Sequence, residues 1–585
     1  MRTRSLVRCH GIGPIVLAFL GLLTIIGIPI SRAVPQTAAT GALVGEVLGP
    51  TGKGIPGASV ELKNQEMAAS RSTVSDEEGR FVFTLLLPGT YQVAAQKDGY
   101  SQGKSTVSVS VTETARLSIP LKIAGLTQSV EVRANVSGVQ TDSAALGRVV
   151  DGDMVTSLPL VTRNYTQIAV LSPGVSAGVF NAGELGSGGM PQSQISGSAD
   201  GIFVHGSRSY DNNYELDGVS VNDVQGSGSS SGGIPIPNPD LIQAFKVQTG
   251  LYDAAYGRFG GANVSVVTKT GGNDFHGTVF EFWRNDILNA NDFFLNEAGQ
   301  PRAALKQNQF GFTLGGPILK DKLFFFGSYE GTRQINGLAS GQARIACTAT
   351  LRTPPLTNDR SAAALGKLFG DKSGALGGVA VNSDGSNINP VALELLNYKL
   401  PGGSYLIPTP QAMDPTAPFA RQGLSAFSEP CSFDEDQFSA NVDYLVSPKS
   451  KIAGRFFFAN DNETVTFPGN GLNPIGNVAG FPSPFSAGYR VFSLAHTYMF
   501  SNTKVNEARF GYVRTSGRTS ATAPFSWSSV GVAEGEMSEA NELPSVQILG
   551  SLNMTSGYPR RFAQNSFVFG ELGKYAMKHG MIPPV

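Results

Sequence analysis

The stretch Val247–Phe294 reads VQTGLYDAAYGRFGGANVSVVTKTGGNDFHGTVFEFWRNDILNANDFF and separates two parts of the chain that differ in character. Before it, the sequence consists of short alternating strands and tracts of Gly and Ser. After it, the strands are longer and aromatic, with polar residues on one face and apolar residues on the other. Such a change is expected where the chain passes from water into lipid. We therefore expect soluble modules first and a membrane β-barrel from residue 275 onward.

The composition favours a β-rich chain with a lipid-facing surface over a helical enzyme. Charged residues make up 15% of the chain, compared with about 25% in soluble domains, and there are 71 Gly and 35 Phe. The formal net charge of −1 gives no electrostatic basis for binding nucleic acid. Nucleic acid is therefore not an expected partner.

Three cysteines occur, and Cys9 lies in a segment that we expect to be removed on export. Cys347 and Cys431 could form one disulfide in an oxidising compartment, or they could be two unrelated thiols. The sequence contains neither a CxxC pair nor a Cys/His cluster, so we expect no metal site and no cofactor.

Residues 1–33 have the three parts of an export signal. Three arginines precede an apolar run at 12–30, and Ser31-Arg32-Ala33 offers a small-x-small cleavage site. Gly and Pro within the run favour cleavage over the alternative, a membrane anchor. No later stretch approaches 18 uninterrupted apolar residues, so only a closed barrel could cross a bilayer.

Residues 41–122 alternate apolar and polar side chains in short runs that Gly and Pro turns separate, which predicts an antiparallel β-sandwich. GIPGASV at 54–60, D-x-x-G-x-F at 76–81 and L-x-P-G-x-Y at 86–91 resemble the carboxypeptidase regulatory-like (transthyretin-like) domain. The resemblance implies a spacer or protein-binding module. A protease is not expected, because neither H-x-x-E nor HExxH occurs.

A short extended segment follows the sandwich. It consists of Thr127, Gln128, Ser129, Val130, Glu131, Val132, Arg133 and Ala134. The segment resembles the TonB box of TonB-dependent receptors, a strand that is donated to the edge of a partner's sheet. This resemblance implies an energy-transducing TonB-type protein of the periplasm as partner. An ordinary interdomain strand is the alternative.

Residues 127–272 are expected to form an α+β plug domain. They resemble the plug of Oar-like TonB-dependent receptors through five motifs in the same order: Leu158-Pro159-Leu160, Arg163-Asn164, Ser172–Val175, Gly206–Arg208 and Leu216–Val219. Within the last motif, Asp217-Gly218 predicts the turn between two strands.

Two G-x-S-x-G matches contain Ser176 and Ser230. A nucleophile elbow needs a buried strand before the serine and a helix after it, and neither sequence continues into a helical pattern. We therefore expect no enzymatic activity. A secreted hydrolase is the third hypothesis, and it would require loss of activity on S176A or S230A.

From residue 275 the strands alternate with a period of two. Phe310, Phe312 and Leu314 share one face of 307–314, and the segments 437–444 and 492–500 follow the same pattern. Apolar residues outside and polar residues inside are typical of transmembrane barrels, although soluble sandwiches alternate in the same way. Strands of about ten residues and long loops such as 335–430 favour the barrel.

Segments 256–286, 307–333 and 500–514 resemble the beginning of an Oar-like receptor barrel. Residues 275–585 provide eight or so expected strands, whereas a barrel that holds a plug needs about 22. We therefore expect an incomplete antiparallel barrel, and a chain that is a fragment of a longer protein.

The junction itself predicts contacts between plug and barrel. Residues 277–284 are expected to form the first barrel strand, with Phe280 and Phe282 facing lipid. We also expect Arg208 and Asp217 at the interface between plug and barrel. We expect Arg258 and Glu281 either there or as ordinary loop and lumen charges.

The leading hypothesis is an outer-membrane TonB-dependent receptor that takes up a scarce solute by rearrangement of its plug. This function is implied by the resemblance, which leaves the solute open and makes outer-membrane lipid a further partner. The alternative is a surface adhesin, or a scaffold that binds protein or carbohydrate, without transport.

Overall fold

The structure, a computed structural model, describes residues 39–67, 69–123, 131–133, 145–160, 163–177, 202–208, 211–222, 236–252, 260–291, 302–337, 345–370, 372, 379–468, 477–501, 504–520, 522–532, 545–548, 552–555 and 560–575. The expected export signal at 1–33, residues 127–130 and 134, Ser230 and Arg258 lie outside the described residues.

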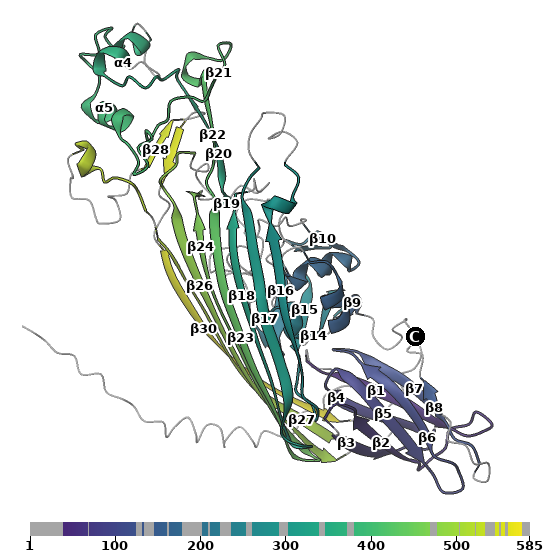
Figure 1. The fold of residues 1–585 in the computed structure, drawn as a ribbon. Helices are drawn as coiled ribbons and strands as arrows, with labels where there is room; N and C mark the ends of the chain where they lie inside the picture. Colours follow the sequence, from purple (N-terminus) through teal and green to yellow (C-terminus); the bar gives the residue numbers. More distant parts are fainter. Residues whose placement is uncertain are drawn as a thin grey trace, which may run out of the picture.

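Three bodies follow one another along the chain. A tall sheet carries the second half of the sequence, the plug strands lie against one face of it, and the N-terminal sandwich lies at its lower end (Figure 1). The fold is mainly β, as the sequence predicts.

The N-terminal body is a β-sandwich of two sheets, ordered β4-β1-β7 and β3-β2-β5-β6-β8. Its core includes Leu43, Val60, Phe83 and Val93, each at most 2% exposed, and the alternation of apolar residues brings these side chains between the sheets. The strands are β1 (Gly41–Leu48), β2 (Ser59–Asn64), β3 (Ser70–Val74), β4 (Arg80–Leu86), β5 (Gly89–Gln96), β6 (Gly103–Val109), β7 (Thr114–Pro120) and β8 (Glu131–Arg133).

Strand β8 is the described part of the TonB-box-like segment. It pairs in parallel with Lys104–Thr106 of β6. Residues 131–133 therefore extend the edge of the sandwich's own sheet.

The plug contains a five-stranded sheet ordered β13-β12-β15-β14-β9, with short helices beside it. Asp151 caps helix α2, because its side chain accepts a hydrogen bond from the Met154 amide. The elements are β9 (Leu146–Asp151), α2 (Gly152–Ser157), η2 (Tyr165–Leu171), β10 (Val175–Ala177), β11 (Ile202–Val204), β12 (Asn213–Leu216), β13 (Val219–Ser220), η4 (Pro239–Leu241), β14 (Ile242–Gly250) and β15 (Asn263–Thr268).

The third body, called the wall below, is one antiparallel sheet of eight strands ordered β16-β17-β18-β23-β24-β26-β27-β30. The sheet is not closed, as the strand count predicts. Apart from β16, the strands are 14 to 19 residues long, more than the ten expected. They are β16 (His276–Asn285), β17 (Leu305–Leu319), β18 (Leu323–Asn336), β23 (Cys431–Ser447), β24 (Ser450–Val465), β26 (Ser483–Ser501), β27 (Lys504–Thr519) and β30 (Arg560–Tyr575).

The two faces of the wall differ as the alternation predicts. Phe312 and Phe438 point away from the plug and are 49% and 46% exposed, whereas Gln309 and Asn441 on the inner face are at most 3% exposed. At these positions the inner face is polar and covered, and the outer face is apolar and open.

The expected orientation of β16 is wrong. Phe280 and Phe282 face the plug, since the guanidinium of Arg163 lies 4.6 and 4.1 Å from their ring centres. Val279 and Trp283 take the outer face and are 89% and 53% exposed. Apolar residues occupy both faces of this strand, so its alternation alone does not distinguish lumen from lipid.

The wall strands are joined by short turns at one end and by long connections at the other. The connection between β18 and β23 contains α4 (Ala362–Phe369), α5 (Pro390–Asn397), β20 (Thr348–Thr353) and β22 (Gly423–Ser428). It shares a hydrophobic cluster with the connections that follow β24 and β27, and this cluster includes Leu351, Leu406, Phe481, Phe525 and Met554. In the part of the chain that the structure describes, no helix is both long and apolar enough to cross a membrane.

Cys347 and Cys431 form a disulfide at the base of this connection, with their Cα atoms 5.4 Å apart. Of the two alternatives that the sequence left open for these cysteines, the structure therefore has the disulfide and not two unrelated thiols. It ties the long connection to the first residue of β23.

Candidate functional site: the interface between plug and wall

The Asp217-Gly218 turn lies against the wall. Leu216 pairs with Val219, so β12 and β13 form the predicted hairpin. Both turn residues have positive φ, 50° at Asp217 and 75° at Gly218, as two-residue hairpin turns require. The turn therefore forms where the sequence predicts it.

The Asp217 carboxylate organises the plug side of this contact. Its two oxygens accept hydrogen bonds from the backbone amide and the hydroxyl of Thr268, both at 2.9 Å. Burial raises the pKa of Asp217, and the nearby guanidinium groups of Arg455 and Arg509 act in the opposite direction. The carboxylate thus links two plug strands and faces positive charge on the wall.

Arg509 of β27 holds the turn from the wall side. Its guanidinium donates a hydrogen bond to the Asp217 carbonyl and a second one, at 2.6 Å, to the Glu507 carboxylate. A Cβ atom on Gly218 would overlap this guanidinium. A Cβ on Gly511 would likewise lie 2.7 Å from the Val219 side chain. Two glycines therefore permit the close approach of turn and wall.

Two amide side chains of β23 continue the contact. Asn441 donates to the Thr268 hydroxyl at 2.9 Å and to the Lys269 carbonyl at 2.8 Å. Gln437 donates to the Ile236 carbonyl at 2.9 Å and accepts from the Asn238 amide at 3.1 Å. Both side chains are at most 4% exposed, so water does not compete for these bonds.

Arg163 forms the principal charged contact. It bonds to Asp240 in the plug and lies 3.4 Å from Glu330 of β18. The three side chains are between 4% and 15% exposed. The stacking on Phe280 and Phe282 covers the guanidinium from the side of β16. One plug arginine thus contacts two strands of the wall.

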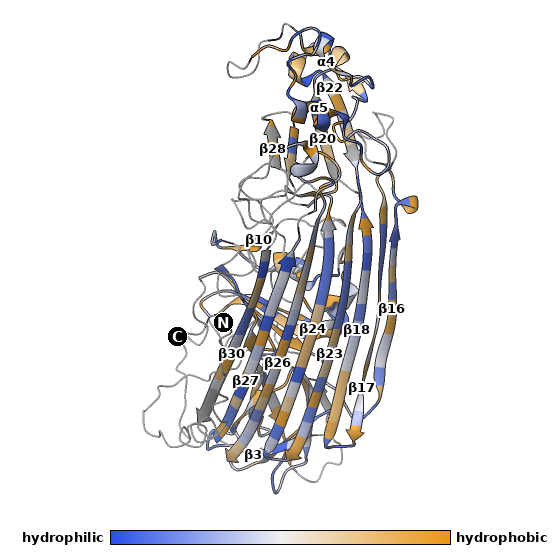
Figure 2. Cartoon of the chain, turned by 90° about the vertical axis from the view of Figure 1, so that its left-hand side faces the viewer, coloured by the Kyte–Doolittle hydropathy of each residue, from blue (hydrophilic) through white to orange (hydrophobic). Residues whose placement is uncertain are grey.

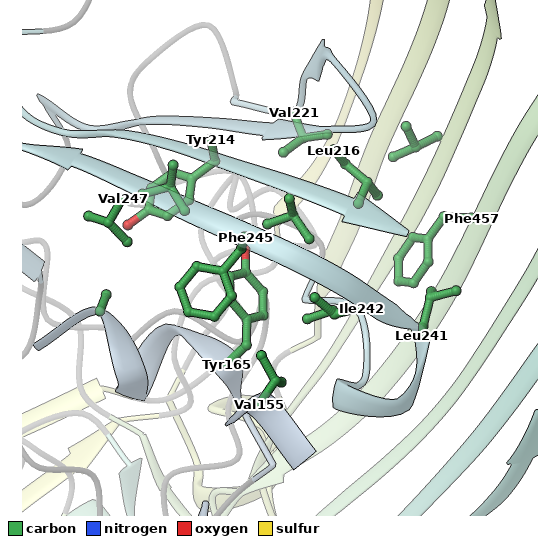
Figure 3. Packing of buried hydrophobic residues seen from close by; sticks show 14 of the residues in the cluster. Val155, Tyr165, Tyr214, Leu216, Val221, Leu241, Ile242, Phe245, Val247 and Phe457 are labelled. Carbon is green, nitrogen blue, oxygen red and sulfur yellow. The ribbon is translucent and has the colours of Figure 1, made fainter. Parts of the chain in front are cut away.

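Apolar side chains fill the space between these polar contacts. A single cluster contains the plug core, with Tyr165, Tyr214 and Phe245, and wall residues such as Phe457 and Val491. Figure 3 shows Phe457 beside Leu216 and Leu241 of the plug. The plug core is therefore completed by the wall.

The sandwich also touches the plug. The Lys246 side chain is 1% exposed, donates to the Thr112 carbonyl at 3.1 Å, and lies 4.0 Å from Glu113. Burial lowers the pKa of Lys246, and Glu113 opposes this effect. Ala39 and Val111 of the sandwich pack on Ala244 and Val267 of the plug.

All three bodies meet at Asn273, just before the first wall strand. Its backbone amide donates to the Glu66 carbonyl of the sandwich at 2.8 Å. Its side chain exchanges two hydrogen bonds with Asp321 in the β17–β18 turn, at 2.9 and 2.7 Å. The passage from plug to wall is thus fixed by the sandwich as well.

A cavity of about 560 Å³ lies at this end, between the sandwich, the plug and the short turns of the wall. Met67, Leu86 and Arg71 line it on the sandwich side, and Asp217, Arg455 and Arg509 line it on the other. The contact between plug and wall therefore borders an open space at the short-turn end.

Of the four interface residues expected from the sequence, the structure describes three, and Arg258 lies outside the described residues. Asp217 lies at the interface. Arg208 is exposed after β11, where its amide donates to Asp211. Glu281 is exposed and, by alternation, shares the outer face of β16 with Val279, so it is not brought to the plug.

Sequence reasoning missed the wall partners Glu330, Asn441 and Arg509. Alternation could have assigned them to the inner face, yet it does not indicate which inner residues meet the plug. Arg163 was within an identified motif, but its two carboxylate partners lie 77 and 167 residues away in the chain.

Comparisons with known proteins agree with the geometry. Residues 267–579 match the family described as outer membrane beta barrel domain. Residues 42–122 match the carboxypeptidase regulatory-like domain. The sequence is 28% identical over 299 residues to the TonB-dependent transporter Oar of Myxococcus xanthus. This match covers 48% of this chain and 26% of that protein. The resemblance found in the sequence is thereby confirmed.

Partial likeness to solved structures is also found. The transporter YddB from Escherichia coli has a TM-score of 0.42 and 10% identity, covering 74% of this chain and 45% of that one. A mutant of the ferric enterobactin receptor PfeA from Pseudomonas aeruginosa has a TM-score of 0.39 and 13% identity, covering 73% and 46%. The chain spans about a quarter of the curated relative that it matches.

Proposed function

This chain belongs to the family of outer membrane β-barrel domains, and from that membership we propose that it serves a TonB-dependent receptor which imports a solute by moving its plug. The protein resides in the bacterial outer membrane. The curated relative is a TonB-dependent transporter, and we propose no enzymatic activity for this chain.

The observation that carries the proposal is the mixed nature of the contact between plug and wall. It combines one buried charged group around Arg163 with separate hydrogen bonds at Asn441, Gln437 and Arg509. Each such bond contributes a net stabilisation of about 1 kcal/mol. Contacts of this kind hold the plug at rest and can be broken one after another by an applied force.

The parts of the chain have separate roles in this proposal. Residues 1–33 direct export, 41–122 form the regulatory-like sandwich, 127–272 form the plug, and 275–585 begin the barrel. The sandwich contacts the plug through Lys246 and the first wall turn through Asn273, so a force on the sandwich would reach both bodies.

We place the energy-transducing partner at residues 127–134. Among the described strands, β8 pairs only with β6, which leaves one edge of β8 for a strand from the partner. The motif resemblance and this edge position support the same segment.

Deletion of Thr127–Ala134 from the full-length protein tests the proposal. Cells with this receptor as their only importer are offered a panel of iron chelates, saccharides and peptides. We expect surface binding of the imported solute to persist and its uptake to stop. Unchanged uptake would refute the assignment of the partner site.

A second candidate function is adhesion, and the long connections favour it. They carry helices and a hydrophobic cluster of their own at the end of the wall away from the sandwich (Figure 1). Binding of a surface partner that persists in cells without the energy-transducing system, together with no uptake of any solute in the panel, would support adhesion.

A further inference from the structure

We propose that four arginines on the outer face of the wall form a binding site for a phosphorylated glycolipid headgroup of the outer leaflet. We call them the arginine cluster. They are Arg490 in β26, Arg514 and Arg518 in β27, and Arg561 in β30. The site is separate from the contact between plug and wall and goes beyond solute transport.

The strand register brings the four residues together. Arg490 pairs with Arg514, and Arg518 pairs with Arg561. Four residues along a strand separate the two pairs by about 13 Å. Gly488 and Ser516 lie between them on the same face, so no large side chain fills the centre. The two pairs suit a headgroup that carries two phosphates, one on each sugar of a disaccharide.

The cluster faces away from the plug. Val491 and Val513, the next residues along β26 and β27, are buried in the cluster shared with the plug core, so alternation directs Arg490 and Arg514 outward. Arg490 and Arg514 are half-buried, whereas Arg518 and Arg561 are exposed.

An aromatic band borders the cluster on the side of the short turns. Tyr512 contacts Phe567 with ring centres 5.2 Å apart, and Phe510 contacts Phe569 at 5.3 Å. Phe567 and Phe569 are 62% and 66% exposed, as expected of side chains that face lipid. Figure 2 views this outer face, and the upper ends of β27 and β30 above the band are hydrophilic. The cluster thus lies at the level of headgroups on the side of the long connections.

The charges of the cluster are not neutralised by the protein. Arg490 donates to the Asn460 amide oxygen at 3.0 Å and lies over the Phe458 ring, and Arg514 donates to Asn565 at 2.9 Å. Among the described residues, no carboxylate oxygen lies close enough to any of the four guanidinium groups to form an ion pair, that is, within 4.0 Å.

An arginine elsewhere on the outer face is neutralised. Arg333 of β18 lies in the row that leads across the sheet to Arg518, and it bonds to Asp436 at 2.9 Å and lies 3.9 Å from Asp434. The arginine cluster therefore carries positive charge that no carboxylate balances, whereas the charge of Arg333 is balanced. Arg333 thus provides a matched control for variants of the cluster.

Phosphate is the anion that this arrangement fits best. A guanidinium can bind two phosphate oxygens at once, and an exposed arginine at a membrane surface is attracted to anionic headgroups. The position at the border of the lipid-facing band favours a ligand whose acyl chains lie on the aromatic residues below, which distinguishes a lipid from a soluble anion.

The test measures binding of the purified full-length protein in detergent to diphosphorylated lipid A and to the same lipid after removal of both phosphates. With about 1 kcal/mol per arginine, R514Q/R518Q should weaken binding of the phosphorylated lipid about 30-fold. The control R333Q should bind as the wild type does. Equal binding by wild type and R514Q/R518Q would overturn the proposal.

The wild-type protein alone provides an independent check if the double variant does not fold. Diphosphorylated lipid A should bind at least about tenfold more tightly than the dephosphorylated lipid, on the same estimate per arginine. Inorganic phosphate should compete only weakly. Equal binding of both lipids, or full displacement by inorganic phosphate, would overturn the lipid assignment. Neither result depends on whether the protein transports a solute.

Discussion

Replacing Arg163 with Met should loosen the plug, because the change leaves two buried carboxylates without their partner. The side chains of Asp240 and Glu330 are 15% and 4% exposed, so water compensates for little of the lost charge. Removing one partner of a buried ion pair costs about 3–5 kcal/mol. The lower figure corresponds to an increase of about 100-fold in the population of the opened plug, at about 1.4 kcal/mol per factor of ten.

Hydrogen exchange of the β14 amides measures this population directly. We expect R163M to accelerate exchange in β14 by about 100-fold or more, by the same estimate. The control R148M removes a half-buried arginine of the same sheet, which contacts the Leu171 carbonyl and the Met154 sulfur, each at 3.5 Å, and should change exchange little. If β14 exchanges equally in R163M and wild type, Arg163 does not hold the plug to the wall.

Three further changes have defined outcomes. G218A should destabilise the hairpin by about 1–2 kcal/mol because residue 218 has a positive φ, and by a further amount because the new Cβ overlaps Arg509. Adding R509A to G218A should restore only the stability lost to the overlap, so hydrogen exchange in β12 should be slower in G218A/R509A than in G218A. Equal exchange of β12 in these two variants would contradict this. Burial raises the pKa of Tyr91 to about 12 from 10.0. The stability that the neutral Tyr91 hydroxyl contributes is therefore complete below pH 10, is lost as the pH rises toward 12, and amounts to about 3 kcal/mol at 1.36 kcal/mol per unit. Y91F should remove this alkaline loss in the exchange of β5, at the cost of about 1 kcal/mol for one hydrogen bond, and an unchanged pH profile would refute it. C347S opens a loop closed over 84 residues and should destabilise the long connection by up to about 4–5 kcal/mol, seen as faster proteolysis of 353–423 with β23 still protected; cleavage at the wild-type rate would contradict it.

The fold could be predicted largely because each body has its own periodicity. Phe312 and Phe438 alternate with covered polar residues, so alternation assigned their strands to a sheet with one polar and one apolar face. The Asp217-Gly218 turn was predictable because two residues with positive φ are needed there, and Asp-Gly is a preferred pair. These are local properties that a sequence displays directly.

The partners across the interface could not be predicted in the same way. Arg163 meets Glu330 only because strand register and the placement of the plug bring them together across 167 residues. The error at β16 has a related cause, since Phe280 and Trp283 are both apolar and the strand has no single apolar face. The disulfide also needed the fold, because sequence alone does not show whether Cys347 reaches Cys431.

The most direct test of transport by plug movement is to fix the plug to the wall. Thr268 and Asn441 touch across the interface, with the Asn441 side chain 2.9 Å from the Thr268 hydroxyl. T268C/N441C in the full-length receptor, joined through a short cleavable thiol cross-linker, should bind its solute at the cell surface without importing it, and cleavage of the linker should restore uptake. Uptake at the wild-type rate while the cross-link is intact would contradict the account.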